Sequence, residues 1–232
     1  MSRDYSRSAN RLLAALPEIE YQRLKPYLTS CSLTAGTIFY EASEKIETVY
    51  FPNTALISLV DILSDGLTTE VALVGGTGMV GLPAILSNGY SSHRAIVQVP
   101  NGGMKISAIV LKREFDRGGE LQKILFNYAQ NRLNETAKLA VCNRHHTIEE
   151  RLARWLLTVQ DLTQSDELPL TQEFISNMLG VRRPGVTVAA GILQKAGLIR
   201  YSRGKITILT RSGLEEAACE CYGLFYDNFY RQ

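Results

Sequence analysis

The sequence predicts an α+β protein with an N-terminal antiparallel β-roll or jelly-roll domain, a long helix and a C-terminal helix-turn-helix followed by a hairpin. Three observations favour this order. Short β-rich runs separated by turn residues fill positions 37–106, residues 120–143 contain no Gly or Pro, and residues 168–211 show helical spacing before a hairpin pattern. The length of 232 residues suits one large or two ordinary domains.

Short helices and then strands are expected in the N-terminal part. Residues 10–28 place Leu and Ile at helical spacing, and Pro17 suits the first turn of a second short helix. Turn residues such as those at 65–66 and 101–103 separate the β-rich runs that follow, and residues 81–86 look like a single helical turn. The expected strands are 37–40, 48–51, 55–62, 68–74, 95–99 and 104–106.

An uninterrupted helix is expected from Glu120 to Asn143. At 1.5 Å per residue it makes a rod of roughly 36 Å, with more apolar surface than one small barrel covers. A parallel partner helix from a second copy would bury this surface; the alternative is that the helix lies across its own domain. The residues expected to pair the two copies are Leu121, Leu125, Tyr128, Leu133, Leu139 and Ala140.

A hinge is expected at 143–147, where the apolar stripe of the long helix stops. Thr147 is a favourable N-cap for the next helix, and Glu149 and Glu150 stand in its first turn, where carboxylates suit the helix dipole. We therefore expect a domain boundary here. The expected parts are a β-roll domain with N-terminal helices (1–117), the long helix and hinge (118–145) and the helix-turn-helix domain (146–232).

The C-terminal region has the pattern of a winged helix-turn-helix. Thr171 is predicted to cap a first helix, and Gly180 permits the tight turn that follows it. A second helix begins near Arg183 and ends before Gly197. A hairpin then turns at 202–205 between two short strands.

Positive charge is concentrated in the same region. The formal net charge of the chain is only +2, yet residues 174–214 contain no Asp or Glu. A positive block in a near-neutral protein points to a polyanionic partner, and DNA is the common one. The basic residues of the block are Arg182, Arg183, Lys195, Arg200, Arg203, Lys205 and Arg211.

The geometry of DNA suggests roles for these side chains. The major groove admits one helix, whose N-terminal residues meet base edges, so Arg183 is the candidate for a bidentate contact with guanine. Basic residues at the end of that helix and on the hairpin are expected to hold phosphates. The expected DNA-binding residues are Thr171, Arg182, Arg183, Thr187, Val188, Lys195, Arg200, Arg203 and Lys205.

Membrane proteins and enzymes find little support in the sequence. Hydrophobic residues make up 45% of the chain and charged residues 21%, and the start of the chain is polar, so a cytoplasmic protein is expected. Gly75–Gly78 lacks the Gly-Lys-Ser/Thr ending of a phosphate loop, and no Ser-His-Asp arrangement is seen. His93 is the single histidine of the β-rich region, too few for a catalytic metal. We expect no enzymatic activity.

Four cysteines are present, at positions 31, 142, 219 and 221. On a helix, Cys219 and Cys221 would point about 200° apart, which is poor geometry for a shared metal ion. The adjacent His145 and His146 would likewise face apart. We therefore expect reduced thiols and structural histidines, with no metal site.

Nearly the whole chain resembles the CRP/FNR family of bacterial transcription regulators, in which a jelly-roll sensor precedes a dimerisation helix and a winged helix. The resemblance rests on Gly78–Leu82 with His93–Ala95, on Asn143-Arg144, on Leu170–Val181 and on Leu198-Ile199. It implies an effector pocket in the β-roll. By this resemblance the pocket residues are Gly78, Met79, Gly81, Leu82, His93, Arg94 and Ala95.

The chain departs from the family pattern at the residues that choose ligands. Cyclic-AMP-binding members carry a glutamate for the ribose and an arginine for the phosphate, where this chain has Met79 and His93. A thioether cannot accept the ribose hydrogen bonds, so cyclic AMP is not expected, although Arg94 would meet a phosphate if the register shifted by one. The N-terminal cysteine group of iron–sulfur members is also missing. Pro184 and Val188 replace the usual Glu and Arg of the recognition helix, so a different operator is expected.

The resulting hypothesis is a homodimeric DNA-binding transcription regulator that places recognition helices in successive major grooves of a palindromic operator. RNA polymerase is a further expected partner. An unidentified effector in the β-roll is expected to gate DNA binding, and no cofactor is assigned. The alternatives are a cyclic-nucleotide-responsive regulator and a constitutive regulator whose sensor pocket is empty.

Overall fold

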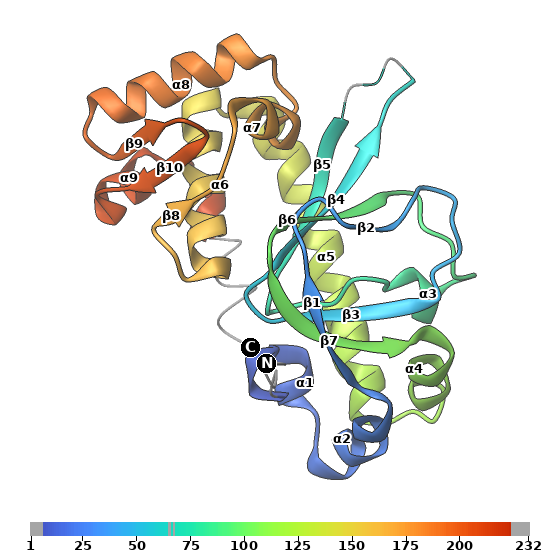
Figure 1. The fold of residues 1–232 in the computed structure, drawn as a ribbon. Coiled ribbons are helices and arrows are strands. Elements are labelled where there is room, and N and C mark those ends of the chain that lie inside the picture. Colours follow the sequence, from blue (N-terminus) through green and yellow to red (C-terminus); the bar gives the residue numbers. More distant parts are fainter. Residues whose placement is uncertain (1–6, 65, 67, 224–232) are drawn as a thin grey trace. The chain divides into compact units, whose positions relative to one another are not determined.

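The computed structural model describes residues 7–64, 66 and 68–223 (Figure 1). The chain divides into two compact units, one made of Met1–Asp61 with Ala72–Leu133 and the other of Ile62–Val71 with Asn134–Gln232. The α+β class is confirmed, with an antiparallel β-roll, a long helix and a C-terminal helix-turn-helix. Among the described residues, none of the helices combines the length and apolar character that crossing a membrane requires.

The strands of the β-roll are β1 (Thr29–Leu33), β2 (Ile38–Tyr40), β3 (Thr48–Pro52), β4 (Leu56–Ile62), β5 (Thr68–Val74), β6 (Arg94–Val99) and β7 (Asn101–Ser107). They form two sheets, with the orders β1-β7-β3 and β2-β6-β4-β5. Strand β7 pairs antiparallel with β1 and with β3, and β6 pairs antiparallel with β2 and β4. Buried side chains from both sheets form the core of this unit.

Two details of the predicted strands are wrong. Strand β1 was missed, because its residues Thr-Ser-Cys-Ser-Leu carry a single large apolar side chain and show no clear alternation. The turn expected at 101–103 is instead the start of β7. A Cβ at Gly103 would lie 2.6 Å from the carbonyl oxygen of Phe51. This glycine therefore marks a close approach of two backbones rather than a turn.

Among the described residues, five α-helices belong wholly or partly to the first unit: α1 (Arg11–Ala15), α2 (Glu18–Leu24), α3 (Pro83–Leu86), α4 (Ala108–Phe115) and α5 (Glu120–His145). Helix α3 confirms the single turn expected at 81–86. Asn10 attaches α1 to the β-roll and is fully buried. Its Oδ1 accepts from the N–H groups of Leu12 and Leu13, and its Nδ2 donates to the carbonyl groups of Pro52 and Gly78.

Helix α5 begins against α2 and runs along the β-roll (Figure 1). The carboxylate of Glu20 accepts hydrogen bonds from the N–H groups of Glu120 and Leu121, at 3.0 and 2.8 Å. These are two of the amides that a helix leaves unpaired at its N-terminus. The expected helix is therefore confirmed, and it continues two residues beyond the predicted end at Asn143.

The predicted pairing face of α5 is partly wrong. Leu121, Leu125 and Tyr128 are 5%, 1% and 6% exposed, because they pack into the core of their own unit. They cannot reach a second copy. Leu133 and Ala140 are exposed, and Leu139 is half-buried. Helical spacing identified an apolar stripe, but it could not tell which part of the stripe the β-roll covers.

The second unit contains the remaining elements, which are α6 (Ile148–Thr163), β8 (Glu167–Leu168), α7 (Gln172–Leu179), α8 (Arg183–Lys195), β9 (Ile199–Ser202), β10 (Lys205–Ile208) and α9 (Arg211–Ala217). Strands β8, β10 and β9 form an antiparallel sheet in that order. The N-cap at Thr147 is confirmed. Its hydroxyl accepts from the N–H of Glu150, whose carboxylate in turn accepts from the N–H of Thr147, forming a capping box.

Candidate nucleic-acid interface

Helices α7 and α8 form the helix-turn-helix that the sequence predicted. Thr171 caps α7 through a 3.1 Å hydrogen bond that its hydroxyl accepts from the N–H of Phe174. Gly180 follows with φ +61°, the left-handed conformation that glycine adopts without strain. Helix α8 packs closely on α6, since a Cβ at Gly185 would lie 2.9 Å from Ile148 Cδ1. This contact with α6 fixes which face of α8 points away from the second unit.

The first turn of α8 carries positive charge at the helix end where the dipole is already positive. Arg182 is the N-cap and Arg183 the first helical residue, and no acidic residue stands in this turn. Helices α6 and α7 have the usual arrangement, with Glu149 and Glu150 in one first turn and Glu173 in the other. The arginines of α8 therefore oppose the stability of their own helix, and both are exposed. This placement favours a role in binding an anion.

Beyond these arginines, the outer face of α8 carries short apolar side chains. Val188 is 59% exposed and Ile192 is 47% exposed one turn later. Sequence reasoning included Val188 but did not identify Ile192. The hydroxyl of Thr187 is 3.1 Å from both Gln172 Oε1 and the carbonyl oxygen of Arg183. Thr187 thus links α8 to α7 through its hydroxyl proton, and its methyl group and the acceptor capacity of its oxygen are left for another partner.

Strands β9 and β10 form the predicted wing. Lys205 pairs with Ser202, so Arg203 and Gly204 are the two central residues of the hairpin turn. Their φ angles are +48° and +78°, as a type I′ turn requires. Gly suits this conformation, but Arg does not, and left-handed backbone costs an ordinary residue about 1–2 kcal/mol. A cationic side chain is therefore held at the tip of the wing at the expense of local stability.

The remaining basic residues of the block differ in their surroundings. Lys195 and Arg200 are exposed. Lys205 forms an exposed ion pair with Glu167, with 2.5 Å between Nζ and Oε2. Arg211 lies apart in function, because its guanidinium group donates to Asp161, Gln160 and Glu215 at 2.8–2.9 Å and holds α9 against α6. Burial acts to lower the pKa of Arg211, but its hydrogen bond and ion pair with Asp161 outweigh burial and raise it.

In the expected effector pocket, neither the side chain nor the backbone of Met79 offers a free polar group to a ligand. The Met79 side chain is 2% exposed and belongs to the hydrophobic core. The hydroxyl of Tyr128 donates to the carbonyl of Met79 at 3.0 Å and accepts from its N–H at 3.2 Å. A Cβ at Gly78 would lie 2.6 Å from that hydroxyl oxygen. Gly81 has φ +103° and leads into α3 through Leu82.

The second half of the expected pocket lies at the start of β6. Ala95 is fully buried, and Arg94 forms an ion pair with Glu41, with 2.8 Å between Nε and Oε2. His93 Nδ1 is buried and has no hydrogen-bond partner within the described part of the chain. A phosphate ligand at Arg94 therefore has to compete with a carboxylate that is already in place.

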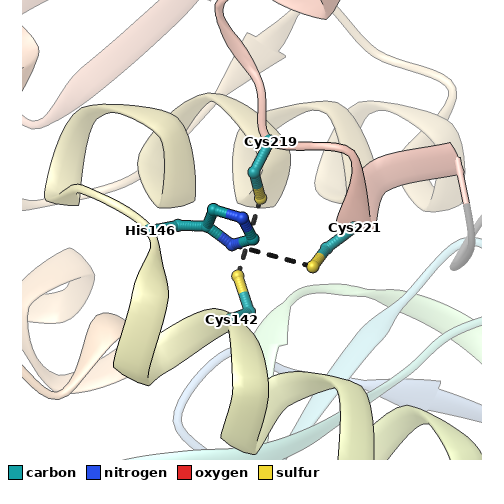
Figure 2. Close-up of side chains that lie close together, drawn as sticks. All are labelled: Cys142, His146, Cys219 and Cys221. Atoms are coloured by element: carbon teal, nitrogen blue, oxygen red, sulfur yellow. Dashed lines mark hydrogen bonds between the residues drawn. The ribbon is translucent and has the colours of Figure 1, made fainter.

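A second group of side chains was missed from the sequence. The argument against a shared site assumed that Cys219 and Cys221 lie on one helix, and this is wrong: Cys219 follows the end of α9 in a loop. The Sγ atoms of both residues lie near Cys142 and His146 (Figure 2). His145 is exposed, whereas His146 turns inward. The signal in the sequence was the Cys-x₃-His spacing, which places both side chains on one helical face.

A comparison with known families matches residues 150–217 to the Crp-like helix-turn-helix domain. The match extends from α6 to the end of α9 and thus covers the proposed interface. No curated protein matches the sequence of this chain.

Solved structures of three proteins share the fold of this chain over most of their length. FixK2 from Bradyrhizobium japonicum has a TM-score of 0.69 at 19% identity, covering 83% of this chain and 98% of its own. A CRP/FNR-family transcriptional regulator from Thermus thermophilus has a TM-score of 0.67 at 20% identity, covering 82% and 98%. The c-di-GMP-responsive regulator CLP from Xanthomonas campestris has a TM-score of 0.66 at 13% identity, covering 83% and 99%. The resemblance predicted from the sequence is confirmed.

Proposed function

We propose that this chain, which has the fold of CRP/FNR-type transcription regulators and a Crp-like helix-turn-helix domain, is a homodimeric regulator that binds a palindromic DNA operator. Helix α8 enters the major groove and the wing lies over the adjacent backbone. The proposed activity is regulation rather than catalysis, and RNA polymerase is proposed as a further partner at the promoter.

The basic first turn of α8 is the observation that carries this proposal. Two exposed arginines stand at a helix N-terminus that lacks any acidic residue. Backbone N–H groups at such an end already attract anions, so a DNA phosphate adds the missing negative partner, and a guanine edge offers two acceptor atoms to an arginine. Arg203 at the wing tip is the second residue whose placement costs stability and offers charge to a ligand.

The exposed face of α5 supports dimerisation. Phe126, Gln130, Leu133, Ala137 and Ala140 lie along it, and the steps between them are four, three, four and three residues. This is the a/d spacing of a coiled coil. It lies on the helix face opposite the residues packed into the β-roll. A parallel pair of α5 helices along this seam relates the two recognition helices by a twofold axis. A pseudo-palindromic operator with half-sites about 34 Å apart requires this symmetry.

For the β-roll we propose that cyclic AMP is not the effector. Support comes from the Met79 side chain, which is committed to the core, and from Tyr128, which occupies the backbone groups of the same turn. Arg94, the candidate phosphate ligand, is paired with Glu41. An effector of different chemistry would act by favouring one of two dimer arrangements; a constitutive regulator is the alternative if no ligand alters operator affinity.

Replacing Arg183 by Ala should weaken operator binding by about 1–3 kcal/mol and relax the preference at one base pair per half-site, because a bidentate guanine contact is lost. Fluorescence anisotropy on a duplex selected from a random pool, and on its single-base-pair variants, measures this. Arg113→Ala on α4 is the control, an exposed arginine outside the helix-turn-helix domain. An equal loss on all duplexes would show that Arg183 contacts phosphate instead.

Replacing Arg203 by Asn should weaken binding to all duplexes alike and reduce the salt-dependence slope by about one per half-site, because a phosphate contact is lost. Asn tolerates left-handed backbone, so the free energy of unfolding should stay unchanged or rise by up to roughly 1 kcal/mol. Binding titrations at several salt concentrations, with denaturant unfolding in parallel, separate the two effects. A loss confined to particular base sequences contradicts the phosphate role.

Replacing Leu133 by Glu should dissociate the dimer, because two leucine side chains leave the seam and about 3 kcal/mol or more of apolar burial is lost per dimer. Leu133 is 66% exposed in one copy, so the fold of each chain should persist. Light scattering with size-exclusion chromatography reports the mass. Lys138→Glu, exposed on the same helix but off the seam, should remain dimeric. A monomeric wild-type protein, or a dimeric L133E variant, rules out this seam.

Cyclic AMP should leave both the melting temperature and the operator affinity unchanged. A ligand present at 100 times its Kd stabilises a protein by about 2.7 kcal/mol, which thermal unfolding detects readily. Calorimetric titration provides an independent reading. Saturable binding of cyclic AMP, or an operator affinity that rises with it, would establish the cyclic-nucleotide-responsive alternative.

A further inference from the structure

Four side chains that can bind a metal ion meet in the second unit. Cys142, His146, Cys219 and Cys221 each offer one ligand atom, and these atoms all lie within 4.8 Å of one another. The three cysteines are buried, at 0%, 4% and 3% exposure. Figure 2 shows the three sulfur atoms and the imidazole pointing toward a common centre. Cysteine and histidine are the ligands of structural zinc sites.

The fold brings these residues together from two distant segments. Cys142 is on the last turn of α5, and the N–H of His146 donates to the Cys142 carbonyl at 3.1 Å, so the helical spacing continues to His146. Cys219 and Cys221 follow α9, more than 70 residues later (Figure 2). The α9 helix is itself held on α6 through Arg211 and Asp161. The packing of the second unit thus brings the four side chains together.

We propose that Cys142, His146, Cys219 and Cys221 bind one Zn²⁺ ion in a tetrahedral Cys₃His site. Tetrahedral zinc with bonds of about 2.3 Å to sulfur and 2.0–2.1 Å to nitrogen separates two sulfurs by about 3.8 Å, and a sulfur from a nitrogen by about 3.5 Å. The Sγ atoms of Cys142 and Cys219 are 3.6 Å apart, and Cys221 Sγ is 3.8 Å from His146 Nδ1. These separations suit a single ion.

The histidine is oriented as a metal ligand requires. His146 Nε2 lies 3.1 Å from a carboxylate oxygen of Glu220, while Nδ1 faces the sulfur atoms. A carboxylate that accepts the N–H of Nε2 leaves the lone pair of Nδ1 free for the ion and fixes the plane of the ring. Glu220 stands between the two cysteine ligands in the sequence, so the same short segment supplies ligands and their support.

Charge around the cluster is complementary to a zinc–thiolate centre. Three thiolates and one Zn²⁺ carry a net charge of −1. Arg151 on α6 is only 7% exposed, and a buried guanidinium group needs a nearby anion. The Nε of Arg151 has no hydrogen-bond partner within the described residues.

The site would tie the segment after α9 to the junction between α5 and α6. Loss of the ion removes a cross-link inside the unit that carries the helix-turn-helix, so the stability of that unit should depend on zinc. A multi-iron cluster fits less well, because its irons stand between the ligands and separate their sulfurs further than one ion does. The inference does not depend on DNA binding, since it rests on geometry outside α7, α8 and the wing.

Metal analysis of the full chain, purified under reducing conditions, tests the proposal. Mass spectrometry of the metals should find about one zinc per chain, in keeping with one tetrahedral site. The double variant C219S/C221S and the variant H146N should lose zinc and unfold at lower temperature. C31S and H145N are matched controls that remove a cysteine and a histidine outside the cluster, and both should retain the metal.

X-ray absorption of the zinc-loaded wild-type protein keeps the test independent of variants that fail to fold. Three sulfur ligands at about 2.3 Å and one nitrogen ligand at 2.0–2.1 Å are expected. Zinc retained in full by C219S/C221S would overturn the assignment. So would iron with inorganic sulfide in place of zinc, a Cys142–Cys219 disulfide in the freshly purified protein, or no metal uptake by the reduced chain in competition with a colorimetric chelator. Operator binding, measured separately, does not affect these outcomes.

Discussion

The hydroxyl of Tyr128 and the backbone of Met79 form the contact on which the arrangement of the first unit depends. The hydroxyl donates to the carbonyl of Met79 and accepts from its N–H, so a single side chain satisfies both backbone polar groups of this buried residue. The contact requires Gly78, where a Cβ would come within 2.6 Å of the hydroxyl oxygen. It commits one face of α5 to the β-roll. The face that carries Phe126 and Leu133 stays exposed in one copy.

This division of α5 explains what the sequence could and could not predict. The absence of Gly and Pro from 120 to 143 was enough to predict the helix. Gly180 and the wing turn were found because left-handed backbone favours glycine, and Thr147 was found because its hydroxyl caps the next helix. The sequence did not distinguish the face of α5 that the β-roll covers from the face that stays exposed. Leu125 and Phe126 are adjacent and equally apolar, yet one is 1% exposed and the other 53%. Only the position of the sheets decides between them.

The cysteine–histidine cluster was beyond sequence reasoning for a different reason. Its two halves are short and weak as motifs: a Cys-x₃-His step at a helix end and a Cys-x-Cys step near the end of the described chain. Neither half alone specifies a site. Their meeting depends on α9 docking onto α6 through Arg211, Asp161 and Gln160. Tertiary packing, rather than spacing along the chain, creates the four-ligand geometry.

The basic residues of the second unit separate into structural and functional groups by what each does for the fold. Arg211 is surrounded by acceptors and stabilises the packing of α9. Arg183 stands at the positive end of a helix dipole, and Arg203 adopts a backbone conformation suited to glycine. A fold selected for stability alone would place neither arginine there. We propose that an anion approaching from outside offsets this cost, and that Arg183 on α8 and Arg203 on the wing mark the surface that it meets.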